Sequence, residues 1–553
     1  MKITARLLSG AAIAALSLGV ALAADAPAEV DTSTVARRLT ADEYRTIITD
    51  VFGPTVELGG RFEPELRVKG LLAVGTTHVS VTSAGMEQYD SMARSIASQV
   101  VDPKHRDLIP CRPANDKAAD DACTAAFMGK VGRLLYRRPL TDAELKTYVG
   151  AARVATNETK DYWNGLSMSL AAMLSSPKFL FRQVAIVQDK SGQWTMEAHA
   201  KAQQLSFFLW NAGPDLELLA AAEHGELDNK KGLTKQVDRM LASARVEAGV
   251  RAFFADNLGF DEFDTLTKDA ALFPKFSAQA AADAQEQTLK TIVDLLLVNK
   301  GDYRDVFTTK KTFLTQELAS IYKVPLVNDG PNGSPDTWVP FEFAKDDQRG
   351  GILTQVAFTA LHSPPGRGSP TLRGKALREV LLCQKVPAPP AAVKFDIVQD
   401  TTNPLYKTAR ERLKAHATNP VCAGCHKIID PMGLALENFD GAGAFRTNEN
   451  GAPIDTSGSL DGVNFTNAAE LGKVLHDNPA SSSCLVSRLS SYATGRPIDT
   501  GAPWAQDLMK SFSASGYKLP ELIRAIALSD DFFRVSPPDT KAAEAAAPTQ
   551  PAR

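Results

Sequence analysis

The sequence predicts a mainly α protein made of several helical modules, with minor β structure near residues 445–460. Three observations support this fold class. Apolar residues recur every three or four positions over most of the chain, with little strict alternation. The 553 residues exceed what one hydrophobic core usually organises, so several compact units are expected. Asn450-Gly451 is typical of a tight hairpin turn and marks the expected β element.

The composition is that of an ordinary globular protein. The chain is 44% hydrophobic and 23% charged, with a formal net charge of −3. These values exclude wholesale disorder, a collagen-like fibre and a coiled-coil rod. A mildly acidic chain has no overall attraction for nucleic acid or for anionic membranes, so we expect no nucleic-acid partner.

The first 23 residues have the pattern of a secretory signal peptide. Lys2 and Arg6 precede an apolar run over residues 7–23, which ends with the small-x-small sequence Ala21-Leu22-Ala23. The alternative is an uncleaved anchor. No later stretch is apolar enough to span a bilayer, so no transmembrane segment is expected after cleavage. We therefore predict a protein of the periplasm or a secreted protein, in an oxidising compartment.

The helical elements can be justified in chain order. Thr40 and Glu43 form a capping-box pattern that opens an amphipathic helix, and Thr141 and Glu144 repeat that pattern. Further helices are expected, in order, at residues 166–174, 198–210, 214–222, 233–240, 246–258, 278–298, 468–475 and 484–493. Residues 324–346 are rich in Pro, Gly, Asn and Asp, and they indicate a loop-rich linker.

These elements suggest a division into modules separated by polar or Pro-rich stretches. Pro387–Pro390 indicates a polyproline-like spacer. The expected units are a signal peptide (1–23), an N-terminal helical module (34–105), a helical module with a Cys pair (107–183), a large helical module (190–325), a haem c module (346–446, on the motif described next), a C-terminal helical module (460–535) and a disordered tail (536–553).

The strongest chemical signal is Cys422-Ala-Gly-Cys425-His426, a C-x-x-C-H motif. Two cysteines three positions apart on one helical turn can both reach the vinyl groups of a haem, and the adjacent histidine can supply a proximal nitrogen to the iron. Covalent attachment takes place outside the cytoplasm, as the signal peptide requires. We therefore predict one covalently attached haem c, with Cys422 and Cys425 as anchors and His426 as proximal iron ligand.

Other interpretations of the motif were weighed. A redox C-x-x-C would need a βαβ context, which the neighbourhood does not resemble. A zinc site would need a second ligand pair, and His416 and Cys484 are isolated in the sequence. A simple disulfide between Cys422 and Cys425 remains open.

The sixth iron position decides between electron transfer and reaction with small molecules. His362, in a loop of the same unit, is the best candidate for a distal ligand. Met432 lies only six residues beyond His426, so it is interpreted as a core residue. His416 and His476 are weaker candidates. Pro431 is expected to end the haem-bearing helix, and Gly433 to allow a tight turn.

The other four cysteines suggest disulfides. Cys111 and Cys123 flank a short polar loop that a disulfide could close easily. Cys383 and Cys484 could pair to tie the haem unit to the last helical unit, with two buried free thiols as the alternative. Arg367 and Arg373 could pair with haem propionates or could belong to an ordinary basic turn.

Several stretches together resemble a known family. They are Arg38–Arg45 with Asp50–Gly53, Leu134–Glu144, Met173–Leu180, Leu205–Trp210 with Pro214-Asp215, Arg349–Gln355, Cys422–Asp440 and Ser490–Pro497. This set resembles the secreted planctomycete-type cytochrome proteins built from five modules of unknown function, over most of residues 37–535. The resemblance implies a mainly helical, periplasmic c-type haem protein, without a settled reaction or catalytic residues.

The sequence thus favours a periplasmic c-type haem protein with a redox role, with electron transfer as part of an oxidoreductase acting on an extracellular substrate. The catalytic residues, the substrate and the redox partner are not indicated. One alternative is a peroxidase-like haem enzyme with an open sixth iron site. Another is a binding scaffold in which the haem is ancillary.

Overall fold

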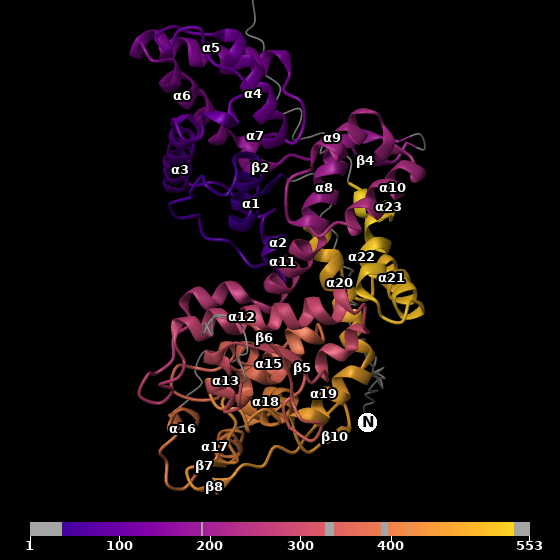
Figure 1. Cartoon of the computed structure of the whole chain (residues 1–553). Helices are drawn as coiled ribbons and strands as arrows, with labels where there is room; N and C mark the ends of the chain where they lie inside the picture. Colours follow the sequence, from indigo (N-terminus) through magenta and orange to yellow (C-terminus); the bar gives the residue numbers. More distant parts are fainter. Residues whose placement is uncertain (1–35, 190–191, 327–336, 389–395, 419, 536–553) are drawn as a thin grey trace, which may run out of the picture.

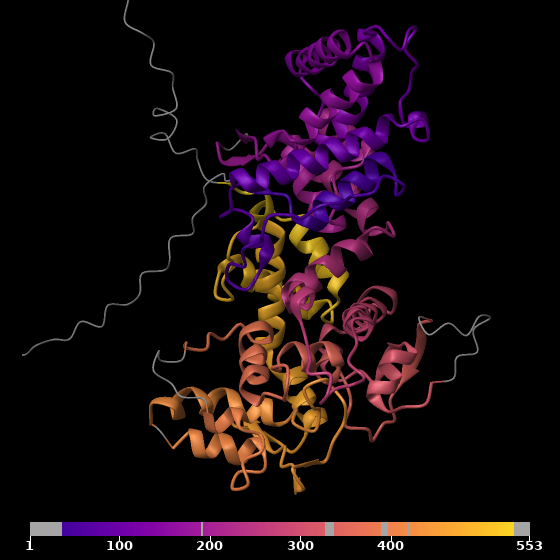
Figure 2. The same ribbon diagram turned by 90° about the vertical axis from the view of Figure 1, so that its left-hand side faces the viewer.

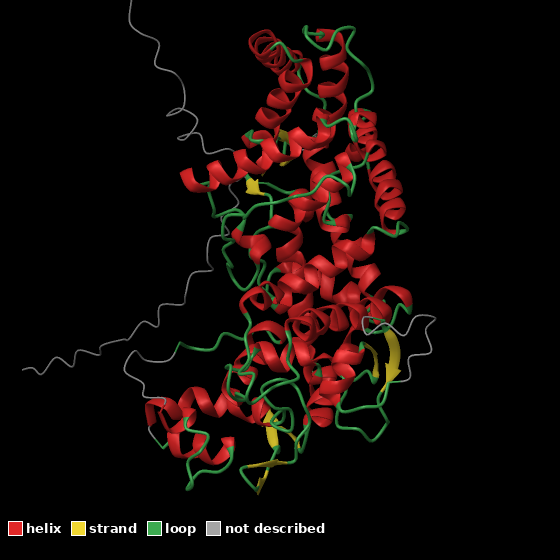
Figure 3. Cartoon of the chain, turned by 60° about the vertical axis from the view of Figure 1, so that its left-hand side comes forward, coloured by secondary structure: helices red, strands yellow, loops and turns green. Residues whose placement is uncertain are grey.

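The computed structural model describes residues 36–189, 192–326, 337–388, 396–418 and 420–535. Over these residues the chain is mainly α, as predicted, and its strands are two to four residues long (Figures 1 and 3). The strands form two-stranded antiparallel pairs. The predicted signal peptide, the predicted tail and most of the polyproline-like stretch lie outside the described residues.

The N-terminal part forms one end of an elongated molecule (Figures 1 and 2). Both predicted capping boxes are confirmed: the Thr40 and Thr141 side chains accept the N3 backbone N–H, and the N3 glutamates accept from the cap N–H. The elements up to residue 182 share one hydrophobic core. They are β1 (Arg37–Arg38), α1 (Ala41–Phe52), α2 (Leu72–Gly75), α3 (Ser83–Val101), a 3-10 turn (Arg106–Leu108), α4 (Asp121–Leu135), α5 (Asp142–Thr159), α6 (Tyr162–Leu174), α7 (Pro177–Leu180) and β2 (Phe181–Arg182).

The middle of the chain contributes most of a second, larger core. The helices predicted at 198–210 and 246–258 are found at these residues, and the one predicted at 278–298 ends in a π turn. The elements are β3 (Ile186–Gln188), β4 (Trp194–Met196), α8 (Ala198–Trp210), α9 (Leu216–Glu223), a 3-10 turn (Glu226–Asp228), α10 (Lys230–Leu241), α11 (Val246–Leu258), a 3-10 helix (Phe260–Thr265), α12 (Ala278–Val293), the π turn (Asp294–Val298), a 3-10 helix (Tyr303–Phe307), β5 (Lys311–Leu314) and α13 (Gln316–Tyr322).

The segment that carries the C-x-x-C-H motif lies at the opposite end of the molecule (Figures 1 and 2). The predicted β element near 445–460 is confirmed, and Asn450 and Gly451 have φ values of 49° and 76° in its turn. The elements are β6 (Val339–Glu342), a 3-10 turn (Ile352–Thr354), α14 (Val356–Leu361), α15 (Pro370–Ala376), a π turn (Leu377–Leu381), α16 (Asp396–Gln399), α17 (Ala409–His416), α18 (Pro420–Leu434), β7 (Asn448–Glu449), β8 (Ala452–Pro453), β9 (Gly458–Leu460) and β10 (Val463–Phe465).

The C-terminal helices lie between the two ends (Figures 1 and 2). Helix α20 contacts α2 and α8 as well as the π turn after α15, so it joins both ends to the larger core. The elements are α19 (Ala468–Asp477), α20 (Pro479–Thr494), α21 (Pro503–Ala514), α22 (Leu519–Ala527) and α23 (Asp530–Phe533).

The prediction of a linker over residues 324–346 was wrong in part. Strand β6 pairs with β5, from Lys311 opposite Glu342 to Leu314 opposite Val339. The aromatic rings of Phe341 and Phe343 pack with centroids 5.1 Å apart. This packing stabilises a strand that the surrounding Pro, Gly and Asp residues concealed in the sequence.

Two disulfides are present among the described cysteines. One joins Cys111 to Cys123, and the other joins Cys383 to Cys484. Both suggested pairings are therefore confirmed. The second disulfide ties the segment after α15 to α20.

Candidate functional site

The C-x-x-C-H motif lies in the first half of α18. Cys422 is buried, Cys425 is partly exposed, and both are free thiols. The disulfide that was considered between them is therefore absent from the structure. Residues three apart on a helix lie on the same face, so the two sulfur atoms can serve one planar cofactor.

His426 is held by a carboxylate one turn further along α18. Its Nδ1 lies 2.7 Å from Oδ2 of Asp430, and the Thr371 hydroxyl of α15 donates to the other carboxylate oxygen at 2.9 Å. Because the carboxylate accepts, Nδ1 carries the proton and Nε2 is left as the coordinating atom. Asp430 and Thr371 were not predicted as site residues, although the i,i+4 spacing of His426 and Asp430 could have indicated the pair.

A second histidine lies against the first. The rings of His416, at the end of α17, and His426 have centroids 5.0 Å apart and an interplanar angle of 74°. Burial, followed by the charge of His426, lowers the pKa of His416, so its neutral, ligating form is favoured. The sequence placed His416 among the weaker candidates because the fold that brings α17 onto α18 is not visible in a local pattern.

His362 lies at the end of α14, where its ring contacts that of Phe358 with centroids 4.7 Å apart. Burial, with the charges of Arg373 and Lys268, lowers its pKa to about 4. Among the residues that the structure describes, no hydrogen bond, ion pair or ring contact joins His362 to the C-x-x-C-H motif. Its role as distal ligand stays a prediction.

The segment after α18 is fastened by the buried guanidinium of Arg373. It donates to the carbonyl oxygens of Leu436 and Phe439 at 2.9 and 2.7 Å, and it pairs with Glu437 at 3.3 Å. The arginine therefore holds the turn that follows the motif helix, and these bonds occupy the side chain that was considered as a propionate partner.

Two expectations about α18 were wrong. Pro431 lies inside the helix, which continues to Leu434. The carbonyl that the proline leaves unpaired belongs to the exposed Lys427, where water can satisfy it. Gly433 is helical rather than in a tight turn, and it permits close packing on α15, because an added Cβ would lie 1.7 Å from the Pro370 carbonyl oxygen.

The apolar residues of this region behave as predicted. Met432 is fully buried in the larger core, in agreement with its interpretation as a core residue. Leu436 and Phe439 are buried in the same core, and Leu434 is buried as well. Their packing fixes the C-terminal half of α18, while Cys425 in the first half stays partly exposed.

The residues at this site fit a covalently attached haem. Two free thiols lie on one helical turn, and the adjacent histidine is oriented through its Nδ1 by Asp430. A Cβ added to Gly424, between the two cysteines, would meet nothing within 4 Å, so there is open space beside the thiols. Among the described residues no group of three or more His, Cys, Asp or Glu side chains is arranged to hold a bare metal ion.

Comparisons with known proteins give a consistent order of domains. Five family models match consecutive segments, and each is described as a protein of unknown function. They are DUF1587 at residues 37–102, DUF1595 at 123–183, DUF1592 at 196–324, DUF1588 at 349–449 and DUF1585 at 461–532. The C-x-x-C-H motif lies within the DUF1588 match. No curated protein and no solved structure matches the chain.

Proposed function

We propose, from the premise that the chain has the five-domain arrangement of the planctomycete-type multi-domain cytochrome c family, that it is an exported redox protein with one haem c. The observation that carries this proposal is the pair of free thiols, Cys422 and Cys425, beside a histidine oriented by a carboxylate. When bound, the haem supplies one-electron chemistry, and the chain anchors and orients it.

The anchoring chemistry needs little from the protein beyond position. Each thiol adds across one vinyl group, so that sulfur bonds to one carbon and the proton ends on the other. Cys422 and Cys425 provide these two bonds, and Nε2 of His426 provides the proximal nitrogen. Asp430 keeps the proton on Nδ1 and holds the ring, and Thr371 holds Asp430 in turn.

Electron transfer favours an iron with two protein ligands. His416 is the histidine that lies against His426, so we take it as the first candidate for the second axial position. His362 is the other candidate, and its lowered pKa of about 4 keeps it in the neutral form that a ligand needs.

Export is supported by two independent features. The N-terminal 23 residues have the pattern of a signal peptide, and the structure contains two disulfides, which are typical of oxidising compartments. Over the described ranges, no helix combines the length and apolarity required to cross a bilayer. The periplasm or the extracellular space is the proposed location.

Expression in cells competent for cytochrome maturation tests the attachment. The mature chain should carry one porphyrin mass and stain for haem in a denaturing gel. The Cys422→Ala variant should lose covalent staining, whereas a Cys111→Ala and Cys123→Ala double variant, which removes a remote disulfide, should keep it. A wild-type chain without added porphyrin mass would end the proposal.

A peroxidase-like enzyme is the second candidate, because the carboxylate of Asp430 increases electron donation from His426 to the iron. The electronic spectrum separates the two functions. A low-spin wild type that becomes high-spin in His416→Ala, but not in His362→Ala, supports the carrier with His416 as ligand. A high-spin wild type that shifts on addition of cyanide favours the enzyme.

A further inference from the structure

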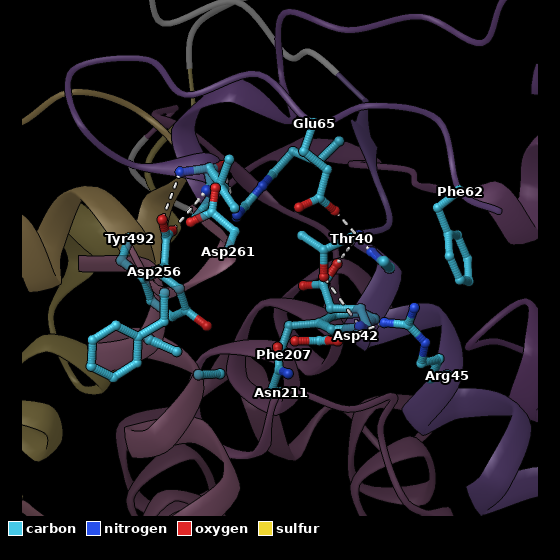
Figure 4. Close-up of a pocket in the computed structure, with 18 of the residues that line it drawn as sticks. Thr40, Asp42, Arg45, Phe62, Glu65, Phe207, Asn211, Asp256, Asp261 and Tyr492 are labelled. Atoms are coloured by element: carbon cyan, nitrogen blue, oxygen red, sulfur yellow. Dashed lines mark hydrogen bonds and ion pairs between the residues drawn. The ribbon is translucent and has the colours of Figure 1, made fainter. Parts of the chain in front are cut away.

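A large cavity lies far from α18, between the N-terminal helices and the helices of the larger core. Its volume is about 730 Å³, within the range of roughly 300–1,000 Å³ that small-molecule sites occupy. Its walls come from α1, α8, α11 and α20, which Figure 1 places at the other end of the molecule from α18. Figure 4 shows Tyr492 and Asp256 on one side of this cavity and Asp42 and Arg45 on the other.

Two buried arginines form part of the cavity wall. In the β1–β2 pair, Arg37 lies directly opposite Arg182, and the two residues are only 6% and 5% exposed. Like charges placed opposite each other on paired strands are destabilising. Glu43 accepts from Arg182 at 3.2 Å, and the Arg182 guanidinium lies 4.2 Å from the centre of the Phe207 ring. The fold therefore maintains a costly arrangement at this wall.

Two hydrogen-bond donors of the wall lack partners among the described residues. Nη1 of Arg37 is buried without a hydrogen bond, although Nε and Nη2 of this side chain bond to Thr76 and Ala73, each at 3.3 Å. The Tyr492 hydroxyl also makes no hydrogen bond with the described part of the chain. Burial lowers the pKa of Arg37 to about 9. A buried donor without an acceptor is costly, and a ligand oxygen would remove that cost.

Most carboxylates of the cavity are already neutralised by arginines. Asp42 pairs with Arg45 at 2.9 Å, and Asp256 pairs with Arg67 at 2.9 Å. Asp261 also pairs with Arg67. The site therefore does not require a charged ligand to balance its walls. It offers donors and acceptors in close proximity, which suits a ligand whose groups can both donate and accept.

Amide and aromatic side chains complete the lining. The side chains of Asn211 and Gln285 make no hydrogen bond within the described residues, so each presents a free amide. Phe62, Phe207 and Phe260 add apolar ring surface to the same cavity. Hydroxyl groups both donate and accept, so they match the amides, the carboxylates and the arginine together, while C–H faces of a sugar ring pack on the aromatic surface.

We propose that this cavity is a binding site for an uncharged, polyhydroxylated ligand of the oligosaccharide class. Arg37 and the Tyr492 hydroxyl bind ligand oxygens at the inner wall, and the phenylalanine rings pack against the sugar faces. The site is separate from the C-x-x-C-H motif and does not depend on haem attachment. It gives the chain a recognition function in addition to the proposed redox function.

Titration of the mature, full-length chain with cellotriose, xylotriose, mannotriose and the acidic sugar digalacturonate tests this proposal. Saturation-transfer NMR detects contact, and calorimetry gives Kd. We expect at least one neutral trisaccharide to bind. Tyr492→Phe removes only the hydroxyl and should weaken that binding about three- to tenfold, the effect of one hydrogen bond. Tyr303→Phe, at an equally buried tyrosine outside the cavity, should leave Kd unchanged.

Three results would overturn the proposal. None of the neutral trisaccharides binds the wild type, or digalacturonate alone binds, which would indicate an anion site. Alternatively, Tyr492→Phe binds as tightly as the wild type, or Tyr303→Phe loses as much affinity as Tyr492→Phe. Thermal unfolding of both variants, measured alongside, separates loss of binding from loss of fold.

Discussion

Replacing Asp430 with Asn tests how the motif histidine is held. The replacement keeps the size of the side chain and removes the charge that accepts from Nδ1 of His426 at 2.7 Å. A hydrogen bond to a charged group contributes about 1.5–3 kcal/mol, and a neutral one about 0.5–1.5 kcal/mol. The variant should therefore weaken this bond by about 1.4 kcal/mol, which is a tenfold factor.

This loss should fall mainly on the ferric protein, because ferric iron makes the Nδ1 proton more acidic and strengthens its bond to a carboxylate. A tenfold factor corresponds to about 59 mV for one electron, so the reduction potential of Asp430→Asn should rise by up to about 60 mV.

Spectroelectrochemical titration measures the potential directly. Thr371→Val keeps the carboxylate and removes only the hydroxyl that donates to it at 2.9 Å, so its potential should change less. Asp461→Asn, at a carboxylate that pairs with Arg378, controls for the loss of a charge elsewhere in this part of the chain. An unchanged or lowered potential in Asp430→Asn would refute the idea that this carboxylate tunes His426.

Two further predictions concern stability. Gly433→Ala places a Cβ 1.7 Å from the Pro370 carbonyl oxygen, so we expect a loss of about 3 kcal/mol in denaturant unfolding, whereas Gly424→Ala, with nothing within 4 Å, should be neutral or slightly stabilising. Equal stability of these two variants would contradict the packing described for α15 and α18. Arg138 holds the pKa of Glu144 well below its usual range, so the pair stabilises the fold at neutral pH, and this contribution is lost as pH falls below about 4.5. Glu144→Gln should lose about 1–2 kcal/mol at pH 7 and change less than the wild type between pH 6 and pH 3; parallel pH profiles would exclude the effect.

Local signals in the sequence predicted the helices well. The capping boxes that begin at Thr40 and Thr141 and the turn at Asn450-Gly451 depend on residues within four positions of each other, and all three are found. Strand β6 was missed because its pairing with β5 and its aromatic packing are tertiary. Pro431 misled the prediction, since helix packing overrode a local breaker.

The candidate site was predictable only where one short motif carried the chemistry. Cys422, Cys425 and His426 follow from their spacing, and their attachment to haem stays a prediction. His416 could not be ranked above His362, because the contact of α17 with α18 depends on the whole fold. The paired arginines Arg37 and Arg182 are 145 residues apart in sequence, and only the β1–β2 register reveals them.

The order in which the chain is synthesised bears on how the larger core is completed. That core includes Leu71, which is made early, and Phe533, which is made near the end. Helix α20, from the last part of the chain, packs against α2 and α8. The nascent protein therefore cannot close its main body until nearly all of its residues have emerged. The cysteine-bearing segment is made before these final helices, so it emerges while the body is still open.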